Sequence, residues 1–328
     1  MLLLTGMLVL GACASTPLES VTPPPLKNAG PPVQVADVDV LEVSPEMEAF
    51  LDRYVLKYKN PHTRMELLIT AVTRSGVLGF QYDETMTKTA SEAFKARAGN
   101  CVAFSNLMVA LARRAGLEAS YQEVLLSAEW SDFEDDTVLL YKHVNVVIET
   151  GQMSWIVDVS GIKIRQSDPR RIVEDSYAKA LYFNNIAVES LLEKDLPTAF
   201  AYVNSAIEAD RNVIDPWVNL GVIYGRNDQL NDAAFALQQA LRINPRDQSS
   251  MSNLYEIYLE QENFQAAAEL EAKVERYRRN NPYYLLRLSD EAMAEEQYEE
   301  SIQLLRKAIN KKYDYHKLYY AMAKTQYL

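Results

Sequence analysis

The sequence predicts two folds in succession, an α+β domain and then an all-α solenoid of helical repeats. Between residues 89 and 159, helical patterns give way to stretches in which apolar and polar residues alternate, as they do in strands. From about residue 176 onward, small and large residues recur every 34 positions. The length of 328 residues is enough for two domains that each bury a core.

The first twelve residues form an apolar segment that is too short to cross a bilayer as a helix. Its length is typical of the apolar region of a signal peptide. It ends in Leu10-Gly11-Ala12-Cys13, which resembles the lipobox of bacterial lipoproteins. This resemblance implies that residues 1–12 are removed and that Cys13 is lipidated. Because Ala14 follows rather than Asp, it also implies an outer-membrane lipoprotein that faces the periplasm. No Lys or Arg precedes the apolar run, which departs from the usual pattern.

Residues 13–45 are expected to be a tether between the lipidated cysteine and the first domain. The segment is rich in proline, with Pro17, Pro23, Pro24, Pro25, Pro31 and Pro32. Proline at this density disfavours helices and strands and stiffens the chain. We therefore expect a semi-rigid spacer here.

Residues 46–172 contain the predicted α+β domain. Thr89 to Glu92 has the pattern of a capping box, which predicts a helix that ends near Arg97. After a loop over 98–100, apolar residues at helical spacing predict a second helix from Cys101 to Arg114. Alternation then predicts three strands, over residues 119–126, 138–149 and 153–159.

Three residues in this domain form a candidate catalytic set. Cys101 is expected in the first turn of a helix, where the backbone N–H groups and the helix dipole favour a thiolate nucleophile. His143 is expected on the second strand and Asp158 on the third, and the turn at 150–152 can place them side by side. This order supplies a base for the thiol and a carboxylate to orient the base.

The motifs around these residues resemble the transglutaminase-like superfamily, whose core is shared with papain-type cysteine proteases. The resemblance covers about residues 60–165 and is carried by Gly99-Asn100-Cys101, by His143-Val144-Asn145-Val146 and by Val157-Asp158. It implies that Cys101 is the nucleophile, His143 the base and Asp158 the orienting acid. Gln81 is a further candidate, as an oxyanion-hole donor beside the backbone N–H of Cys101.

Residues 173–328 are predicted to form the repeat array. Trp217, Leu220, Gly221 and Tyr224, followed by Ala233, Ala240 and Pro245, resemble a tetratricopeptide repeat. Steps of 34 residues place small residues at two positions in nearly every unit: Ala199, Ala233, Ala267 and Ser301 at the first, and Ala206, Ala240, Val274 and Ala308 at the second. Larger residues, Phe183, Trp217, Met251 and Leu285, are expected to fill the gap to the next unit. We expect about four helix pairs, a capping helix from His316 onward, and a fragment from about residue 173 that folds by itself.

Charge and composition exclude several functions. A net charge of −12 disfavours nucleic acid as a partner. With two cysteines and three histidines, a metal site is not expected. The sequence contains no phosphate loop or dinucleotide fingerprint, so we expect no cofactor.

Two hypotheses of function follow. The first is an envelope-anchored, cysteine-dependent amide-bond hydrolase or acyl transferase, a peptidase, amidase or transglutaminase-like enzyme, acting on a peptide or protein. The second is a non-catalytic lipoprotein scaffold. In the first hypothesis the repeats bind a protein partner or the substrate, and in the second they bind a protein partner. Both hypotheses confine membrane contact to the lipid anchor.

Overall fold

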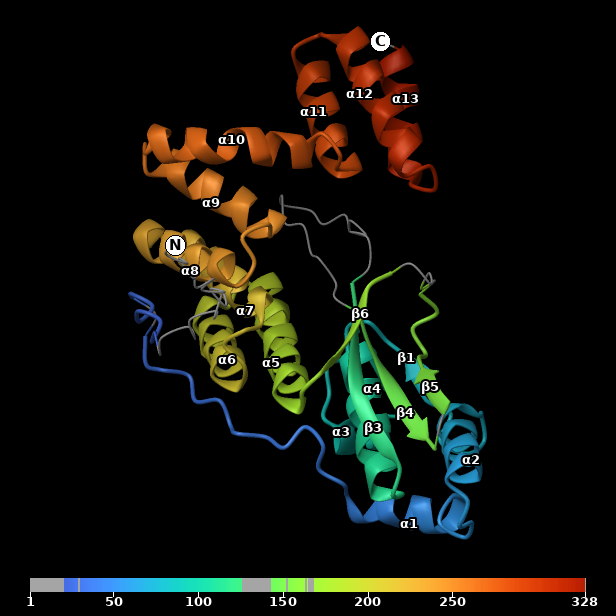
Figure 1. Ribbon diagram of the computed structural model, residues 1–328. Helices are drawn as coiled ribbons and strands as arrows, with labels where there is room; N and C mark the ends of the chain where they lie inside the picture. The colour runs from blue at the N-terminus through green and yellow to red at the C-terminus, as the bar shows by residue number, and fades with distance from the viewer. Residues whose placement is uncertain are drawn as a thin grey trace, which may run out of the picture.

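The computed structural model describes residues 21–28, 30–125, 143–151, 153–162, 164 and 168–327. A domain of helices and a sheet is followed along the chain by a helical array (Figure 1). The apolar segment over 1–12, Cys13 and part of the second predicted strand, 138–142, lie outside the described residues. None of the helices in the described ranges has both the length and the apolar character needed to span a bilayer.

The first domain begins with helices whose starts are fixed by local sequence. In α1 (Pro45–Tyr54) and α2 (Pro61–Thr73), a proline at the first helical position follows a capping Ser44 or Asn60. The capping box is present at α3 (Ala90–Ala96), where the Thr89 hydroxyl accepts from the N–H of Glu92 and the Glu92 carboxylate accepts from the N–H of Thr89.

A four-stranded antiparallel sheet has the order β5-β4-β3-β6. Its strands are β3 (Glu118–Val124), β4 (His143–Thr150), β5 (Met153–Val157) and β6 (Arg170–Val173). The first three correspond to the predicted strands, whereas β6 was not predicted, because four residues give too short an alternation to recognise. A separate parallel pair joins β1 (Gln81–Tyr82) to β2 (Ala98–Gly99).

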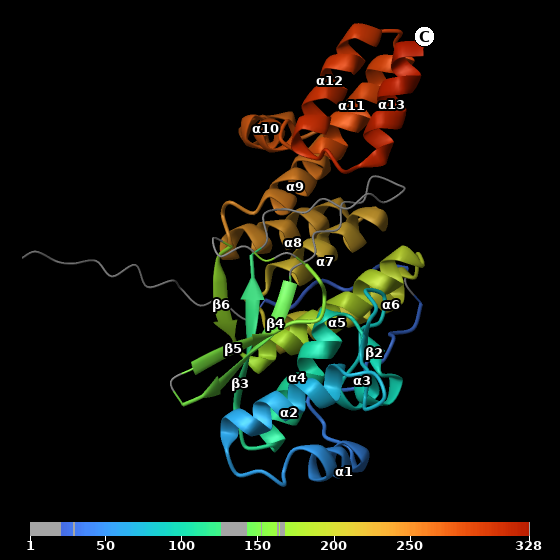
Figure 2. The same ribbon diagram turned by 90° about the vertical axis from the view of Figure 1, so that its right-hand side faces the viewer.

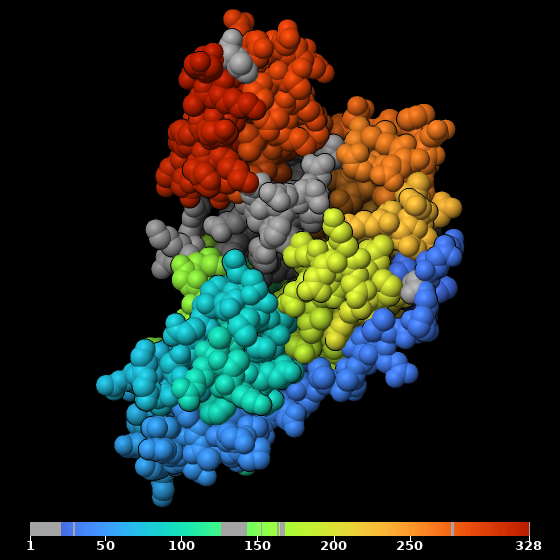
Figure 3. All heavy atoms as spheres, turned by 180° about the vertical axis from the view of Figure 1, so that it is seen from behind, coloured from blue at the N-terminus to red at the C-terminus, as the bar shows by residue number. Residues whose placement is uncertain are grey.

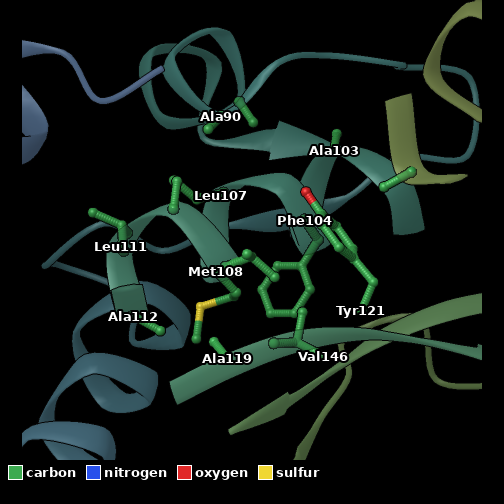
Figure 4. Close-up of a cluster of buried hydrophobic side chains, with 14 of the residues drawn as sticks. Ala90, Ala103, Phe104, Leu107, Met108, Leu111, Ala112, Ala119, Tyr121 and Val146 are labelled. Atoms are coloured by element: carbon green, nitrogen blue, oxygen red, sulfur yellow. The ribbon is translucent and has the colours of Figure 1, made fainter. Parts of the chain in front are cut away.

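The helix α4 (Cys101–Arg114) is the centre of the core. It packs against α3 on one side and against β3 and β4 on the other, and every residue from Val102 to Ala112 is buried (Figures 2 and 4). Phe104, Met108 and Val146 meet in this core between the helix and the sheet (Figure 4). Because α4 is held along its whole length, its first residue, Cys101, has a fixed position relative to the sheet.

The array consists of helices that pack in consecutive antiparallel pairs. Their bounds are α5 (Asp175–Leu192), α6 (Leu196–Ala209), α7 (Ile214–Arg226), α8 (Leu230–Ile243), α9 (Gln248–Glu260), α10 (Phe264–Arg278), α11 (Pro282–Ala294), α12 (Tyr298–Lys311) and α13 (His316–Tyr327). All residues at the two predicted small positions are buried, as are the four larger residues between units. The helix α13 packs on α11 and α12, where the capping helix was expected.

The first array helix also belongs to the core of the first domain. Tyr177, Leu181 and Phe183 from the N-terminal part of α5 lie in the same apolar cluster as α4, whereas Ala187 and Leu191 lie in the cluster of the array. The predicted boundary at 172/173 therefore falls in β6, next to a helix that both parts share.

Candidate functional site

The start of α4 is built by the two residues that precede Cys101. Asn100 is the N-cap: its Oδ1 accepts from the N–H of Ala103 at 3.0 Å, and its Nδ2 donates to Thr87 Oγ1 at 2.8 Å. Position 99 has no room for a side chain, since a Cβ there would lie 2.5 Å from the Cβ of Ala103, so only glycine fits. The Gly-Asn-Cys sequence therefore places Cys101 at the first position of α4, where its own N–H has no partner within the helix.

Cys101 lies next to the first residue of β4. One helical turn further along α4, Ser105 donates from Oγ to the carbonyl oxygen of Val144 at 3.3 Å. Residues four apart share a helix face, so Cys101 is on the face of α4 that meets the start of β4. The thiol is free and half-buried, and it interacts with the imidazole of His143.

His143 and Asp158 are brought together by the β4–β5 pair. His143 is 2 % exposed, and its Nε2 pairs with Oδ2 of Asp158, which follows the last residue of β5. The other ring nitrogen, Nδ1, is buried and meets the hydrogen-bond criteria with no partner among the described residues. With Nε2 engaged by the carboxylate, Nδ1 is the nitrogen left to exchange a proton with the Cys101 thiol.

Two further residues hold Asp158. The N–H and Oγ of Ser160 donate to Oδ1 at 2.9 Å and 2.7 Å, and Nδ2 of Asn145 lies 3.5 Å from Oδ2. The carboxylate is thus fixed by hydrogen bonds at both oxygens. Sequence analysis named Asn145 only as part of the motif around His143 and gave it no role, and it missed Ser160. A Ser two residues after an Asp is a common local hydrogen-bonding pattern and would have been the signal.

The electrostatics of the pair favour charge separation. Burial lowers the pKa of His143, but the hydrogen bond to Asp158 and the interaction with Cys101 outweigh it and raise the pKa to about 9. Burial raises the pKa of Asp158, and the His143 imidazolium together with the Ser160 hydrogen bonds lowers it to about 2. The raised pKa of His143 and the lowered pKa of Asp158 together favour an imidazolium–carboxylate ion pair near neutral pH.

Gln81 lies close in the fold to the loop before Cys101. It is the first residue of β1 and pairs with Ala98 of β2. Its Nε2 donates to the carbonyl oxygens of Gly79 at 3.1 Å and Phe80 at 3.3 Å, so the side-chain amide is used within its own loop. The oxyanion role of Gln81 stays a prediction.

The arrangement can perform nucleophilic acyl chemistry. It contains a thiol at a helix start, an imidazole in contact with it and a half-buried carboxylate that orients the ring. Within the described ranges, no group of three or more His, Cys, Asp or Glu side chains could hold a metal ion.

Comparison with known families agrees with this architecture. Residues 49–159 match the model of the transglutaminase-like superfamily, and residues 214–247 match that of a tetratricopeptide repeat. No curated protein matches the chain significantly by sequence.

Several solved structures are similar to part of the chain. MamA residues 41 to the end, from Desulfovibrio magneticus RS-1, has 16% identity and a TM-score of 0.31, and the match covers 45% of this chain and 83% of that one. The pilF protein of Pseudomonas aeruginosa has 13% identity and a TM-score of 0.35, with 47% and 70% covered. A thermophilic TPR protein of Thermus thermophilus has 15% identity and a TM-score of 0.36, with 45% and 82% covered.

The family matches follow the same order as the two folds of the structure. The first contains α4 and strands β3 to β5, and the second contains α7 and α8 of the array. The chain therefore carries a transglutaminase-like domain followed by tetratricopeptide repeats.

Proposed function

We propose that the chain is a cysteine-dependent enzyme that transfers or hydrolyses acyl groups at amide bonds. One observation carries the proposal: the imidazole of His143 is paired with Asp158 through Nε2 and interacts with Cys101. A cysteine kept only for packing needs neither an imidazole beside it nor a carboxylate behind that imidazole.

The chemistry follows from these positions. The Cys101 thiolate attacks the carbonyl carbon of an amide, and the tetrahedral oxyanion accepts a hydrogen bond from the N–H of Cys101. The His143 imidazolium gives its proton to the departing amine as the C–N bond breaks, which leaves a thioester. Water or a second amine then loses a proton to His143 and attacks the thioester, and the thiol is restored.

The proposed substrate is a peptide or protein, and the repeat array is the proposed surface for a protein partner. Tetratricopeptide repeats expose extended surfaces and are rarely catalytic themselves. Either water or an amine can attack the thioester, so the arrangement of Cys101, His143 and Asp158 supports both hydrolysis and transfer.

We also propose that the protein is an outer-membrane lipoprotein facing the periplasm, on the basis of Leu10-Gly11-Ala12-Cys13. Cys13→Ser is expected to move the protein from the membrane fraction to the soluble periplasm. Unchanged fractionation together with an unmodified mature N-terminus would contradict the lipid anchor.

The enzymatic proposal can be tested with p-nitrophenyl acetate, an activated ester that needs no specific recognition. In a Cys13→Ser background, Cys101 is the sole thiol. We expect a burst of about one p-nitrophenolate per chain and an acetyl group on Cys101 by peptide mass spectrometry. Added glycine ethyl ester then shows whether an amine or water removes the acetyl group.

Two substitutions make the test specific. His143→Ala is expected to abolish the burst, whereas His316→Ala, in the last helix of the array, should leave it unchanged. Acetylation confined to lysines, with Cys101 unmodified in the folded protein, would contradict catalysis and favour the scaffold hypothesis.

A further inference from the structure

The proline-rich segment before the first domain lies on the repeat array. Residues 21–28 form no helix or strand and end in a turn at Lys27 and Asn28, and they run beside α6, α7 and α8 (Figures 1 and 3). The sequence predicts a semi-rigid spacer here, but the described residues contact the array through several hydrogen bonds. The difference arises because proline density describes local stiffness and not the surface that a segment meets.

The array contacts the backbone of this segment through its side chains. Arg211 Nη1 donates to the carbonyl oxygen of Val21 at 3.0 Å, and the Tyr224 hydroxyl donates to that of Pro24. Asn227 Nδ2 donates to the carbonyl oxygen of Lys27 at 3.0 Å. These contacts extend from residue 21 to residue 27, and each array residue lies in or next to the α6–α7–α8 region.

Gln229 makes the most specific contact. Its Nε2 donates to the carbonyl oxygen of Pro25 at 3.2 Å, and its Oε1 accepts from the N–H of Lys27 at 2.7 Å. Both ends of one amide thus bind the backbone at two points, which fixes the register of the segment. Gln229 is 4 % exposed, so this polar side chain is buried beneath the segment.

The chemistry of the contact suits a proline-rich peptide. Prolines have no N–H, so residues 23–25 present only carbonyl oxygens, and the array meets two of these with a hydroxyl and an amide. Leu26 adds an apolar contact by packing on the core of the array. A cavity of about 470 Å³ remains between the segment and α6, lined by Phe200, Asn204 and Ile207 among others. The surface is therefore a groove that this segment does not completely fill.

We propose that Arg211, Tyr224, Asn227 and Gln229 form a docking groove for an extended, proline-rich peptide, and that the chain occupies this groove with its own residues 21–27. The proposal is independent of the chemistry at Cys101. Because the segment is covalently attached, its effective concentration at the groove is about millimolar or higher, and a free peptide binds only when the segment is displaced.

The same segment continues onto the first domain. Asp37 pairs with Lys179 of α5 at 2.6 Å, and the carbonyl oxygen of Val40 accepts from the N–H of Ala90 at 2.9 Å. The N-terminal chain thus contacts the array first and the α+β domain next. A peptide that displaced residues 21–27 would free the part on the array and leave the part on the domain attached.

The first test uses trypsin on the full chain. Lys27 is followed by Asn28, so this bond is a trypsin site, and docking through the Lys27 N–H protects it. Gln229→Ala should speed cleavage after Lys27 by about tenfold, the effect of losing about 1.4 kcal/mol of docking free energy. Gln238→Ala is the matched control, since this exposed glutamine of α8 donates a hydrogen bond to Tyr258 and lies outside the contacts with residues 21–27 that the described structure shows. Equal cleavage in wild type and both variants would overturn the proposal.

The second test measures binding directly, with a fluorescent synthetic peptide of residues 19–30. In a full chain whose residues 21–27 are replaced by a Gly-Ser sequence, the groove is empty and the peptide should bind saturably. The wild-type chain should bind at least about tenfold more weakly, because its groove is occupied. Adding Gln229→Ala to the Gly-Ser variant should weaken binding by about tenfold, the same effect as in the cleavage test. No binding to a Gly-Ser variant that keeps its helical circular dichroism, or equal binding to wild type, would refute the groove.

Discussion

Asp158 engages Nε2 of His143 across the antiparallel β4–β5 pair, and the other nitrogen of the ring is left for Cys101. The polarity of this arrangement decides the chemistry. If the ring were flipped, Nε2 would face the thiol, and Asp158 would lose its contact with that nitrogen. The contact depends on the register of the two strands. Val157, the last residue of β5, pairs with Val146 of β4, so the next residue, Asp158, lies near the beginning of β4, where His143 is.

The support of Asp158 gives the first prediction. Ser160→Ala removes the 2.7 Å hydrogen bond from Oγ and leaves the backbone N–H in place. We expect the hydrogen bond to contribute about 0.5–1.5 kcal/mol to holding Asp158 in place, so its loss should slow acylation of Cys101 by roughly 2- to 10-fold. Ser252→Ala is the control, because its buried Oγ has no hydrogen-bond partner in the described part of the chain. The support role is refuted if both variants react at the wild-type rate.

The His143–Asp158 pair predicts how stability depends on pH. The pKa of His143 is raised to about 9 in the folded state, so its contribution is complete below its unfolded pKa of about 6.5 and is lost as pH rises through 9. The pKa of Asp158 is lowered to about 2, so its contribution is present above about 3.9 and is lost as pH falls toward 2. The difference in melting temperature between wild type and His143→Asn should be largest between about pH 4 and 6.5 and should shrink on both sides. A difference that stays constant with pH would contradict the pair.

Two glycines in α7 test the packing of the array. A Cβ at Gly221 would lie 2.6 Å from Cγ of Leu237 in α8, whereas a Cβ at Gly225 would meet only the end of the Ile257 side chain, at 3.2 Å. Gly221→Ala should therefore destabilise the protein by ~1–3 kcal/mol, because α7 and α8 are forced apart. Gly225→Ala should be neutral or stabilising by up to ~1 kcal/mol through helix propensity. Urea unfolding of both variants measures the contrast, and equal stabilities would show that α7 and α8 do not approach closely.

The shared helix α5 changes the expectation for the isolated array. A fragment from residue 173 exposes Tyr177, Leu181 and Phe183, which are buried against the first domain in the full chain. We expect this fragment to be helical but to bind the dye ANS and self-associate. Adding the separate first domain, residues 30–172, should suppress dye binding. A monomeric fragment without dye binding would show that α5 belongs to the array alone.

The sequence supports the prediction of much of this structure because several of its signals are local. The Thr89–Glu92 capping box, the helix from Cys101 and the 34-residue spacing each depend on nearby residues and recur in the structure. The alternation of residues also predicted that His143 and Asp158 come from adjacent strands. It could not predict which ring nitrogen of His143 bonds Asp158, because that depends on the β4–β5 register and on how deeply the ring is buried.

Other features could not be predicted because they depend on distant contacts or on an unusual residue choice. The turn inside each helix pair contains a left-handed residue, and none of the four is glycine: Lys194, Asp228, Glu262 and Glu296. Glycine is the usual signal for this conformation, so sequence alone gives no warning. The docking of residues 21–27 likewise could not be predicted from the sequence, since it depends on Gln229, which is about 200 residues away along the chain.

The rate of Cys101 alkylation as a function of pH tests the central claim most directly. The assay uses iodoacetamide on the folded Cys13→Ser chain, in which Cys101 is the sole thiol. An ordinary thiol reacts about tenfold more slowly for each pH unit below its pKa of about 8.5. We predict that Cys101 reacts rapidly at about pH 7 and with little change up to about pH 8.5, because the His143 imidazolium stabilises the thiolate. His143→Ala should restore the ordinary pH profile. If wild-type Cys101 already follows that profile, and His143→Ala does not change it, Cys101 and His143 are not a catalytic pair.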